Sequence, residues 1–336
     1  PGRCVTVAVA AAACGLVPAV AAGSGDAGAP MAFRMHDDRV IESSALALSR
    51  THPGLAYTVN DSGHDAEVLV VSLQDGAVVG EATLADAEND DFEALSPARG
   101  GRLIVGDIGD NDAERDSVQL HVIDEPAAGD SRMRPRTVEL TYPGGARDAE
   151  TVVAVGDTVY VVSKEALGSV YAAPVLASSR DRFALRRVAS APSVVTDGAL
   201  LPDGDVVLRS YNEGYLVRRP GWRVLSSFPL PRTQLGESVA SMERGRRVYV
   251  GSEGLHSPVY VVRVPTAEAA RADAGASADR PGAPTPGETA PEGAGDSDGL
   301  QARPTGYLVA VAAALLIGFL VRRRRRRRGR PPIQLR

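Results

Sequence analysis

The chain contains few of the residues on which several common kinds of site depend. Of its 336 residues, two are cysteines (Cys4 and Cys14), one is a lysine (Lys164), and 4% are aromatic. Two cysteines near one end cannot build a disulfide framework or a cysteine-rich zinc domain. Scarce aromatic side chains argue against a stacking surface for bases or sugars.

Catalytic motifs with a fixed spacing are absent as well. The five histidines form no HxH or HExxH pattern, which argues against a zinc hydrolase. No P-loop or G-x-G-x-x-G segment follows a strand-like run, and Gly251–Gly254 is not a G-x-S-x-G elbow. The chain must therefore work, if it is an enzyme, through carboxylates and the few bases among them.

Charge is segregated along the chain. Residues 31–265 contain 34 acidic and 24 basic residues, whereas residues 301–336 contain 10 arginines and no acid. The acidic body argues against a nucleic-acid-binding core, and the basic end needs a separate explanation.

Residues 1–22 have the pattern of a secretory signal peptide. Arg3 precedes an apolar stretch that ends in the small residues Ala19-Val20-Ala21. Both cysteines lie within it, so cleavage near Ala21 leaves a mature chain without cysteine. Lipidation at Cys14 is an alternative, because Ala11-Ala12-Ala13-Cys14 loosely resembles a lipobox.

The C-terminal part has the pattern of a stalk and an anchor. Residues 266–303 are rich in Ala, Gly, Pro, Asp and Glu, which predicts a disordered stalk. Residues 304–321 predict a single transmembrane helix, followed by seven consecutive arginines within a cytoplasmic tail of residues 322–336. We therefore expect a single-pass cell-membrane protein with an extracellular body.

Between residues 31 and 265 the sequence predicts strands throughout. Short runs rich in Val, Leu and Tyr alternate with Gly, Asp, Asn and Pro, as in 55–59, 102–106 and 247–251. No long stretch has the helical period of 3.6 residues. The body is therefore expected to be all-β.

These strands form an internal repeat. Five units open with an acid before a strand of small and aliphatic residues, at a spacing of 40 to 57 residues, and a second strand follows that ends in polar residues. A period of this size with about four short strands favours a β-propeller of five to six four-stranded blades. A sixth blade would have to lie within 112–143, and a strand from 31–40 would close the ring.

The repeat predicts a ring of acids at one mouth of the central channel. The first strand of each blade begins, and the second ends, at the same edge. The opening acids are Glu42, Glu93, Glu150, Asp197 and Glu237, and the polar strand ends contribute Asp61, Asp107, Asp110, Lys164, Arg209 and Glu253. Clustered carboxylates repel one another, so we expect a bound hard cation or interleaved bases. Oxygen ligands favour Ca²⁺, with Mg²⁺ as the second choice.

Several segments resemble a family of secreted bacterial β-propellers related to phytase-like and TolB-like propellers. They are NDSG (60–63), DFEAL (91–95), GDIGDN (106–111), YPGGARDAET (142–151), VVSKE (161–165) and LRSYNEG (208–214). The resemblance implies metal ligands at Glu42, Asp61, Glu93, Asp107, Asp110, Glu150 and Glu237. It also implies an anion or ligand site at Lys164 and Arg209, beside which Tyr211 and Glu253 lie.

Three functions fit these features. The first is a calcium-loaded cell-surface propeller that binds an unidentified ligand or protein at its acidic mouth. The second is a metal-dependent hydrolase of phosphoesters, in which Lys164 and Arg209 hold the anion. The third is a purely structural component whose mouth is a hydrated funnel.

Overall fold

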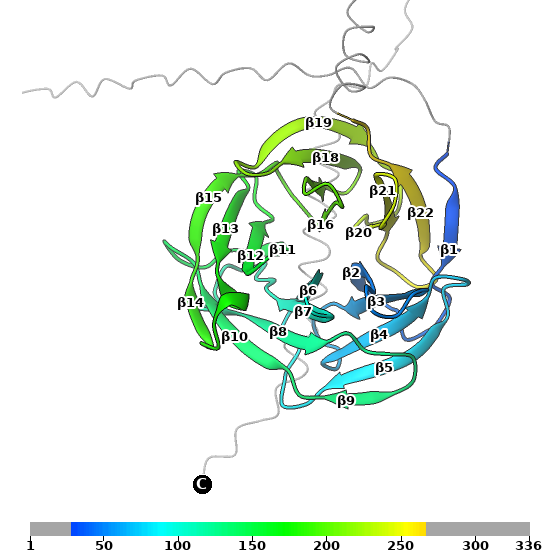
Figure 1. Ribbon diagram of the computed structural model, residues 1–336, viewed down its shortest axis with the longest axis horizontal. Coiled ribbons are helices and arrows are strands. Elements are labelled where there is room, and N and C mark those ends of the chain that lie inside the picture. Colours follow the sequence, from blue (N-terminus) through cyan, green and yellow to red (C-terminus); the bar gives the residue numbers. More distant parts are fainter. Residues whose placement is uncertain (1–27, 267–336) are drawn as a thin grey trace, which may run out of the picture. The chain divides into compact units, whose positions relative to one another are not determined.

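A computed structural model describes residues 28–266, which form a β-propeller of five blades (Figure 1). The innermost strand of each blade contacts the innermost strands of its two neighbours, so the ring is closed around a central axis. The all-β propeller expected from the repeat is confirmed, with five blades.

Each blade is an antiparallel sheet whose strands follow one another from the axis outward. Blade 1 contains β2 (Ser43–Leu48), β3 (Leu55–Asn60), β4 (Glu67–Ser72) and β5 (Val78–Leu84). Blade 2 contains β6 (Phe92–Ala98), β7 (Arg102–Asp107), β8 (Val118–Asp124) and β10 (Arg136–Thr141). Blade 3 contains β11 (Ala149–Val155), β12 (Thr158–Ser163), β13 (Ser169–Ala173) and β15 (Arg186–Ser190). Blade 4 contains β16 (Asp197–Leu200), β17 (Val206–Arg209), β18 (Glu213–Arg218) and β19 (Arg223–Pro229).

Blade 5 closes the ring with both ends of the described range. Its inner strands are β20 (Ser238–Ser241), β21 (Arg247–Gly251) and β22 (Pro258–Arg263), and its outer strand is β1 (Met31–Arg34). β1 pairs antiparallel with β22. The closing strand expected from residues 31–40 is therefore confirmed.

Two short strands correct the expected number of strands in a blade. β9 (Ser131–Met133) leaves the β8–β10 connection of blade 2 and pairs parallel with β5 of blade 1. β14 (Arg182–Ala184) leaves blade 3 and pairs parallel with β10 of blade 2. Blades 1 and 2 therefore have five strands, and residues 112–143 complete blade 2 instead of forming a sixth blade. Pairing an exposed sheet edge with a neighbour's loop satisfies its backbone hydrogen bonds.

The apolar core lies between the blades. Five clusters of buried side chains each join strands of two adjacent blades; one of them contains Ala45 and Val59 of blade 1 with Leu95 and Leu103 of blade 2. Both faces of each sheet are covered by neighbouring blades, which explains why the inner strands are nearly continuous runs of small and aliphatic residues.

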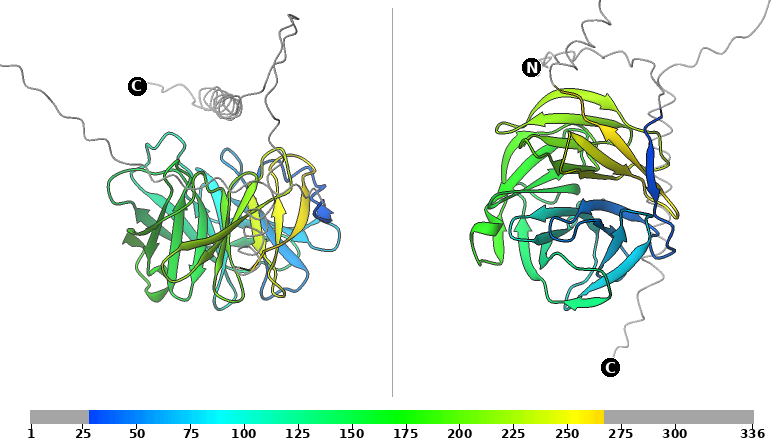
Figure 2. Two further views of the ribbon diagram at one scale, coloured as in Figure 1. Left: turned by 90° about the horizontal axis from the view of Figure 1, so that it is seen from above. Right: turned by 45° about the vertical axis from the view of Figure 1, so that its right-hand side comes forward.

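The strands run between two faces of the propeller, as the views in Figure 2 show. We call the face where each innermost strand begins the site face, and the opposite one the far face. β22 runs away from the site face, and β1, antiparallel to it, runs toward it. Both ends of the described range, near residues 28 and 266, therefore lie at the far face.

The predicted signal peptide, stalk, transmembrane helix and tail lie outside the described residues, except for residue 266. Within residues 28–266, no helix is long and apolar enough to cross a membrane. The one short helix there is η1 (Val175–Ala177), in the far-face connection between β13 and β14.

Candidate functional site: a carboxylate cluster at the site face

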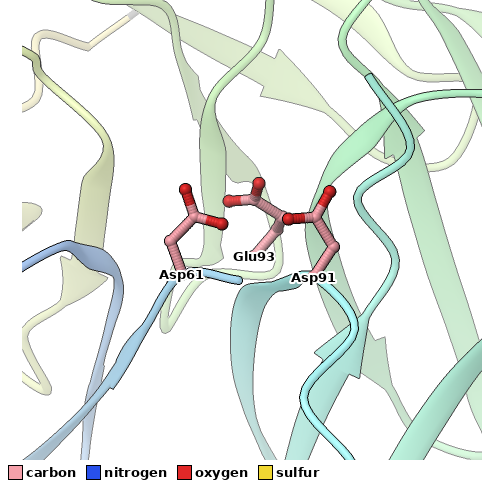
Figure 3. Close-up of side chains that lie close together, drawn as sticks. All are labelled: Asp61, Asp91 and Glu93. Carbon is pink, nitrogen blue, oxygen red and sulfur yellow. The ribbon is translucent and has the colours of Figure 1, made fainter. Parts of the chain in front are cut away.

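One group of side chains within residues 28–266 has the spacing of a metal site. Carboxylate oxygens of Asp61, Asp91 and Glu93 all lie within 4.8 Å of one another, and we call these residues the carboxylate triad. Figure 3 shows the three carboxylates turned toward a common region. Asp91 and Glu93 are 2% and 4% exposed, so two of the three charges are almost removed from water.

A β-bulge places Glu93 in the triad. Phe92 pairs with Asp107 and Ala94 pairs with Gly106, which leaves Glu93 as an extra residue between the two pairs. Such a bulge bends the strand and redirects a side chain, and bulges are common near functional sites. The same irregularity occurs at Glu150 in blade 3 and at Ser44 in blade 1.

Asn89 holds the two segments of the triad together. Its amide nitrogen donates hydrogen bonds to the carbonyl oxygens of Asn60 and Asp61, at 3.1 and 2.9 Å. Its amide oxygen accepts a hydrogen bond from the backbone N–H of Phe92, at 2.9 Å. One side chain thus fixes the end of β3 against the beginning of β6. Sequence reasoning missed Asn89, although an Asn just before a strand is a common turn signal.

The backbone of Asp91 is held by a buried ion pair. Oδ1 of Asp107 accepts hydrogen bonds from the N–H of Asp91 and from Nη1 of Arg115, at 3.0 and 2.8 Å. A Cβ atom on Gly109 would lie 2.5 Å from a carboxylate oxygen of Asp91, so only glycine fits beside the triad. Asp107, a predicted metal ligand, thus supports the triad from behind.

Burial and neighbouring charges together perturb Glu93 of the triad. Burial raises the pKa of Glu93 well above its usual range, and the nearby charges of Asp61, Glu150 and Asp91 raise it further. Lys164 acts in the opposite direction, with a smaller effect. Without another cation, Glu93 therefore tends to hold a proton.

The opposite side of the channel has its own cation. Lys164, at the end of β12, forms an ion pair with Glu150, and both side chains are nearly buried. The ammonium also lies 5.6 Å from the centre of the Tyr211 ring. Burial lowers the pKa of Lys164, but Glu150, Tyr211, Glu237 and Glu93 raise it by more, so the ammonium stays charged.

Arg209 donates hydrogen bonds to backbone carbonyl oxygens of blades 4 and 5. It is 1% exposed, and its guanidinium donates hydrogen bonds to the carbonyl oxygens of Ser210, Tyr211, Ser238 and Gly251. Burial lowers the pKa of Arg209 to about 10, although Asp197 and Glu237 raise it in part. Four of its five N–H groups are engaged, which leaves little capacity for the predicted anion.

The carboxylate of Asp197 also has hydrogen-bond partners within the protein. Its carboxylate accepts hydrogen bonds from the N–H groups of Gly198 and Val239, at 2.7 and 2.6 Å, and so joins blade 4 to blade 5. Burial raises the pKa of Asp197 well above its usual range, against these hydrogen bonds and Arg209.

The remaining predicted ligands lie at the site face but outside the triad. Glu42 accepts a hydrogen bond from, or pairs with, His64, at 3.1 Å. Asp110 accepts hydrogen bonds from the N–H groups of Glu114 and Arg115 in its own turn. Glu237 is close enough to affect the pKa values of Lys164 and Tyr211, and the backbone N–H of Glu253 bonds to Leu235.

The strand register corrects the prediction that the opening acids occupy one equivalent position. The first paired residues of the innermost strands are Ser43, Phe92, Ala149, Asp197 and Ser238. Glu42 and Glu237 precede these positions, Asp197 occupies one of them, and Glu93 and Glu150 follow in a bulge. Aligning the repeats by their opening acids gave the wrong register, because a bulge inserts one residue that the amino-acid sequence does not reveal.

The donors of the triad fit a hard cation. Three carboxylates supply oxygen ligands only, which suits Ca²⁺ or Mg²⁺ better than zinc or copper. Asp61 is partly exposed and leaves a route to solvent, while Glu93 supplies a buried charge.

Comparisons with known proteins found distant structural neighbours. No family model and no curated protein matches the chain. The β-propeller domain of Cps50 (Swd1) from Myceliophteria thermophila is 13% identical, with 66% of this chain and 84% of that one covered and a TM-score of 0.40. Hydrazine synthase from Kuenenia stuttgartiensis is 18% identical, with 65% and 57% covered and a TM-score of 0.36. Sqt1 from Chaetomium thermophilum, solved with the N-terminus of a ribosomal protein, is 16% identical, with 71% and 64% covered and a TM-score of 0.34. None is similar enough to indicate a function.

Proposed function

We propose that this propeller is a binding protein that holds Ca²⁺ at Asp61, Asp91 and Glu93 and uses its site face to bind a ligand. The observation that supports this most directly is the spacing of the triad, with oxygens within 4.8 Å of one another and Glu93 almost fully buried. A divalent cation would offset the neighbouring negative charges that help to raise the pKa of Glu93. Mg²⁺ is the second choice, because it demands a stricter geometry.

Thermal unfolding of the full-length chain, with Ca²⁺ or with excess chelator, tests this proposal. A ligand that binds only the folded state stabilises it by about 2.7 kcal/mol at a free concentration of about 100 times Kd. We expect Ca²⁺ to raise the melting temperature and Glu93→Gln to abolish that rise. Glu243→Gln, at an exposed acid of the far face, is the matched control and should respond as the wild type. Equal melting temperatures with Ca²⁺ and chelator would refute the calcium site.

A phosphoester hydrolase has less support than binding. The two bases expected to hold the anion already have partners: Lys164 pairs with Glu150, and Arg209 bonds to four carbonyl oxygens. A panel of phosphomonoesters with Ca²⁺ tests the alternative. Turnover by the wild type that is lost in Glu150→Gln would favour hydrolysis.

We also propose that the chain is anchored in the cell membrane with the propeller outside, on the evidence of residues 1–22 and 304–336. The described chain begins and ends at the far face. Fractionation tests this: the full chain should be found with membranes, and a chain ending at residue 303 should be released.

A further inference from the structure

We infer that the site face binds a polypeptide segment that combines basic and apolar side chains. The inference rests on the proposed function in one respect, namely that this face does the binding. It does not require Ca²⁺ at the triad.

The first support is the distribution of charge between the two faces. The ten connections at the site face contain 17 acidic and 5 basic residues; they are 35–42, 61–66, 85–91, 108–117, 142–148, 164–168, 191–196, 210–212, 230–237 and 252–257. The connections at the far face contain 8 acidic and 6 basic residues; they are 49–54, 73–77, 99–101, 125–130, 156–157, 174–181, 201–205, 219–222 and 242–246. Negative charge is thus concentrated on one face, and such a field attracts a cationic partner.

The charge is also uneven within the site face. The first four of its connections, which lead into or lie within blades 1 and 2, carry 13 of the 17 acids and 2 of the 5 bases. A further base, Arg134 between β9 and β10, pairs with Asp86 of the third connection. Asp112 and Asp116 are exposed there, in the β7–β8 connection of blade 2. A basic segment is therefore expected to lie over blades 1 and 2.

The second support is the distribution of exposed apolar side chains. Seven large apolar residues are exposed within residues 28–266, and four of them lie in site-face connections: Ile41, Leu167, Leu235 and Leu255. Leu167, between β12 and β13 of blade 3, is 88% exposed, and Leu255, between β21 and β22 of blade 5, is 56% exposed. In a ring of five, blade 3 lies opposite the junction of blades 5 and 1. Ile41 lies at that junction, Leu255 lies in blade 5, and Leu235 lies in the connection from blade 4 to blade 5. Apolar contacts are thus available on both sides of the acidic mouth.

Together these features specify the chemistry of the occupant. An acidic surface repels nucleic acid and anionic lipid. Negative charge alone also does not account for the exposed leucines. A peptide with lysine or arginine beside large apolar residues satisfies both, because interfaces combine apolar anchors with charge complementarity at their edges. The arginine-rich segment 322–336 of this chain has the charge for the same surface, and it is the competing occupant if the membrane anchor proposed above fails.

Selection from a random phage-displayed peptide library against the immobilised full-length chain, at about 0.15 M salt, tests this inference. We expect the enriched peptides to carry more basic than acidic residues and at least one large apolar residue. The double variants Leu167→Asp/Leu255→Asp and Asp112→Lys/Asp116→Lys should each weaken the best peptide by about tenfold or more. The matched controls are Val224→Asp, on the outer strand of blade 4, and Asp181→Lys/Glu243→Lys, at the far face; they should change its affinity by less than about twofold.

Four results would overturn the inference. They are no enrichment, acidic peptides, equal weakening by the controls, and tighter binding of a peptide of residues 322–336 than of any selected peptide. Repeating the selection with chelator separates the two proposals. Peptide binding that depends on the site face with or without Ca²⁺ supports the inference even if the calcium site fails. A Ca²⁺-dependent melting temperature without such peptides upholds the calcium site alone.

Discussion

The two sides of the channel mouth handle buried negative charge in different ways. In blades 1 and 2, Asp61, Asp91 and Glu93 gather their carboxylates within 4.8 Å, and the pKa of Glu93 is raised well above its usual range by burial and by its acidic neighbours. In blades 3 to 5, Glu150 pairs with Lys164, while Asp197 accepts backbone hydrogen bonds near Arg209. On the second side a base or backbone N–H groups contact each carboxylate, whereas on the first side Arg115 pairs with Asp107 and three carboxylates meet at one point.

The difference indicates where function and where stability reside. Crowding carboxylates in a buried place is costly, and a protein keeps such a cluster where binding can offset that cost. Four predictions test the contrast, beginning with the largest expected effect on stability.

Arg209→Met should cost about 3–5 kcal/mol of unfolding free energy, because four carbonyl oxygens, two of them in buried hydrogen bonds, lose their donor and Asp197 loses a nearby positive charge. Denaturant unfolding of the full-length chain measures the loss. Arg223→Met, at an exposed arginine of β19, is the control and should stay within about 0.5 kcal/mol of the wild type. A loss of less than about 1 kcal/mol for Arg209→Met would show that these hydrogen bonds are dispensable.

Lys164→Met should cost about 3 kcal/mol, because Glu150 is left buried without its ion-pair partner. The double variant Lys164→Met/Glu150→Gln should recover most of the loss, since no unpaired charge remains. A double-mutant cycle by denaturant unfolding measures this coupling. Additive effects of the two changes would mean that Lys164 and Glu150 are not coupled, and the contrast with the triad would then lose this support.

The stability of the calcium-free chain should depend on pH through Glu93. The unfolded chain releases this proton near the ordinary pKa of 4.5, whereas the folded chain keeps it to higher pH. Between the two pKa values the folded state binds more protons, so the unfolding free energy falls as pH rises, by up to about 1.4 kcal/mol per pH unit.

Denaturant unfolding at several pH values measures this slope as the difference between the wild type and Glu93→Gln. Ca²⁺ should reduce the slope, because it replaces the proton in the site. Glu243→Gln serves as the control and should keep the slope of the wild type. An identical pH dependence for the wild type and Glu93→Gln would show that Glu93 is not perturbed.

Asn89→Ala should have the smallest effect on stability, about 1 kcal/mol, for the loss of its hydrogen bonds to Asn60, Asp61 and Phe92. It should nevertheless weaken Ca²⁺ binding about tenfold, because supporting residues orient metal ligands. Calorimetric titration with Ca²⁺ measures the affinity. Asn212→Ala, at a site-face Asn of blade 4, should leave it unchanged. Unchanged binding in Asn89→Ala would remove its positioning role.

Much of the fold follows from patterns that are local in the sequence. Runs such as 102–106 and 247–251 are strands because they are rich in aliphatic residues and are bounded by turn residues. The regular repeat of these runs predicts the blades. The exchange of β9 and β14 between blades could not be predicted, because their short sequences specify no partner.

The candidate site could be predicted in part. Asp61 and Glu93 were among the predicted metal ligands, and Asp91 opened a repeat without being chosen as one. The predicted ring of acids was expected to include bases, and the ion pair of Lys164 with Glu150 is one such case. The bulge at Glu93 and the close approach of Gly109 to Asp91 depend on strand register and on the path of the backbone. Neither can be predicted from the identity of single residues.

By itself, the sequence determined an all-β repeat with acids near the start of its innermost strands, because apolar runs bounded by turn residues act over a few neighbours. Only the tertiary structure decided which of these acids meet and which acquire a base. That outcome depends on bulges and on contacts between blades, where residues distant in the chain share one buried, poorly solvated space.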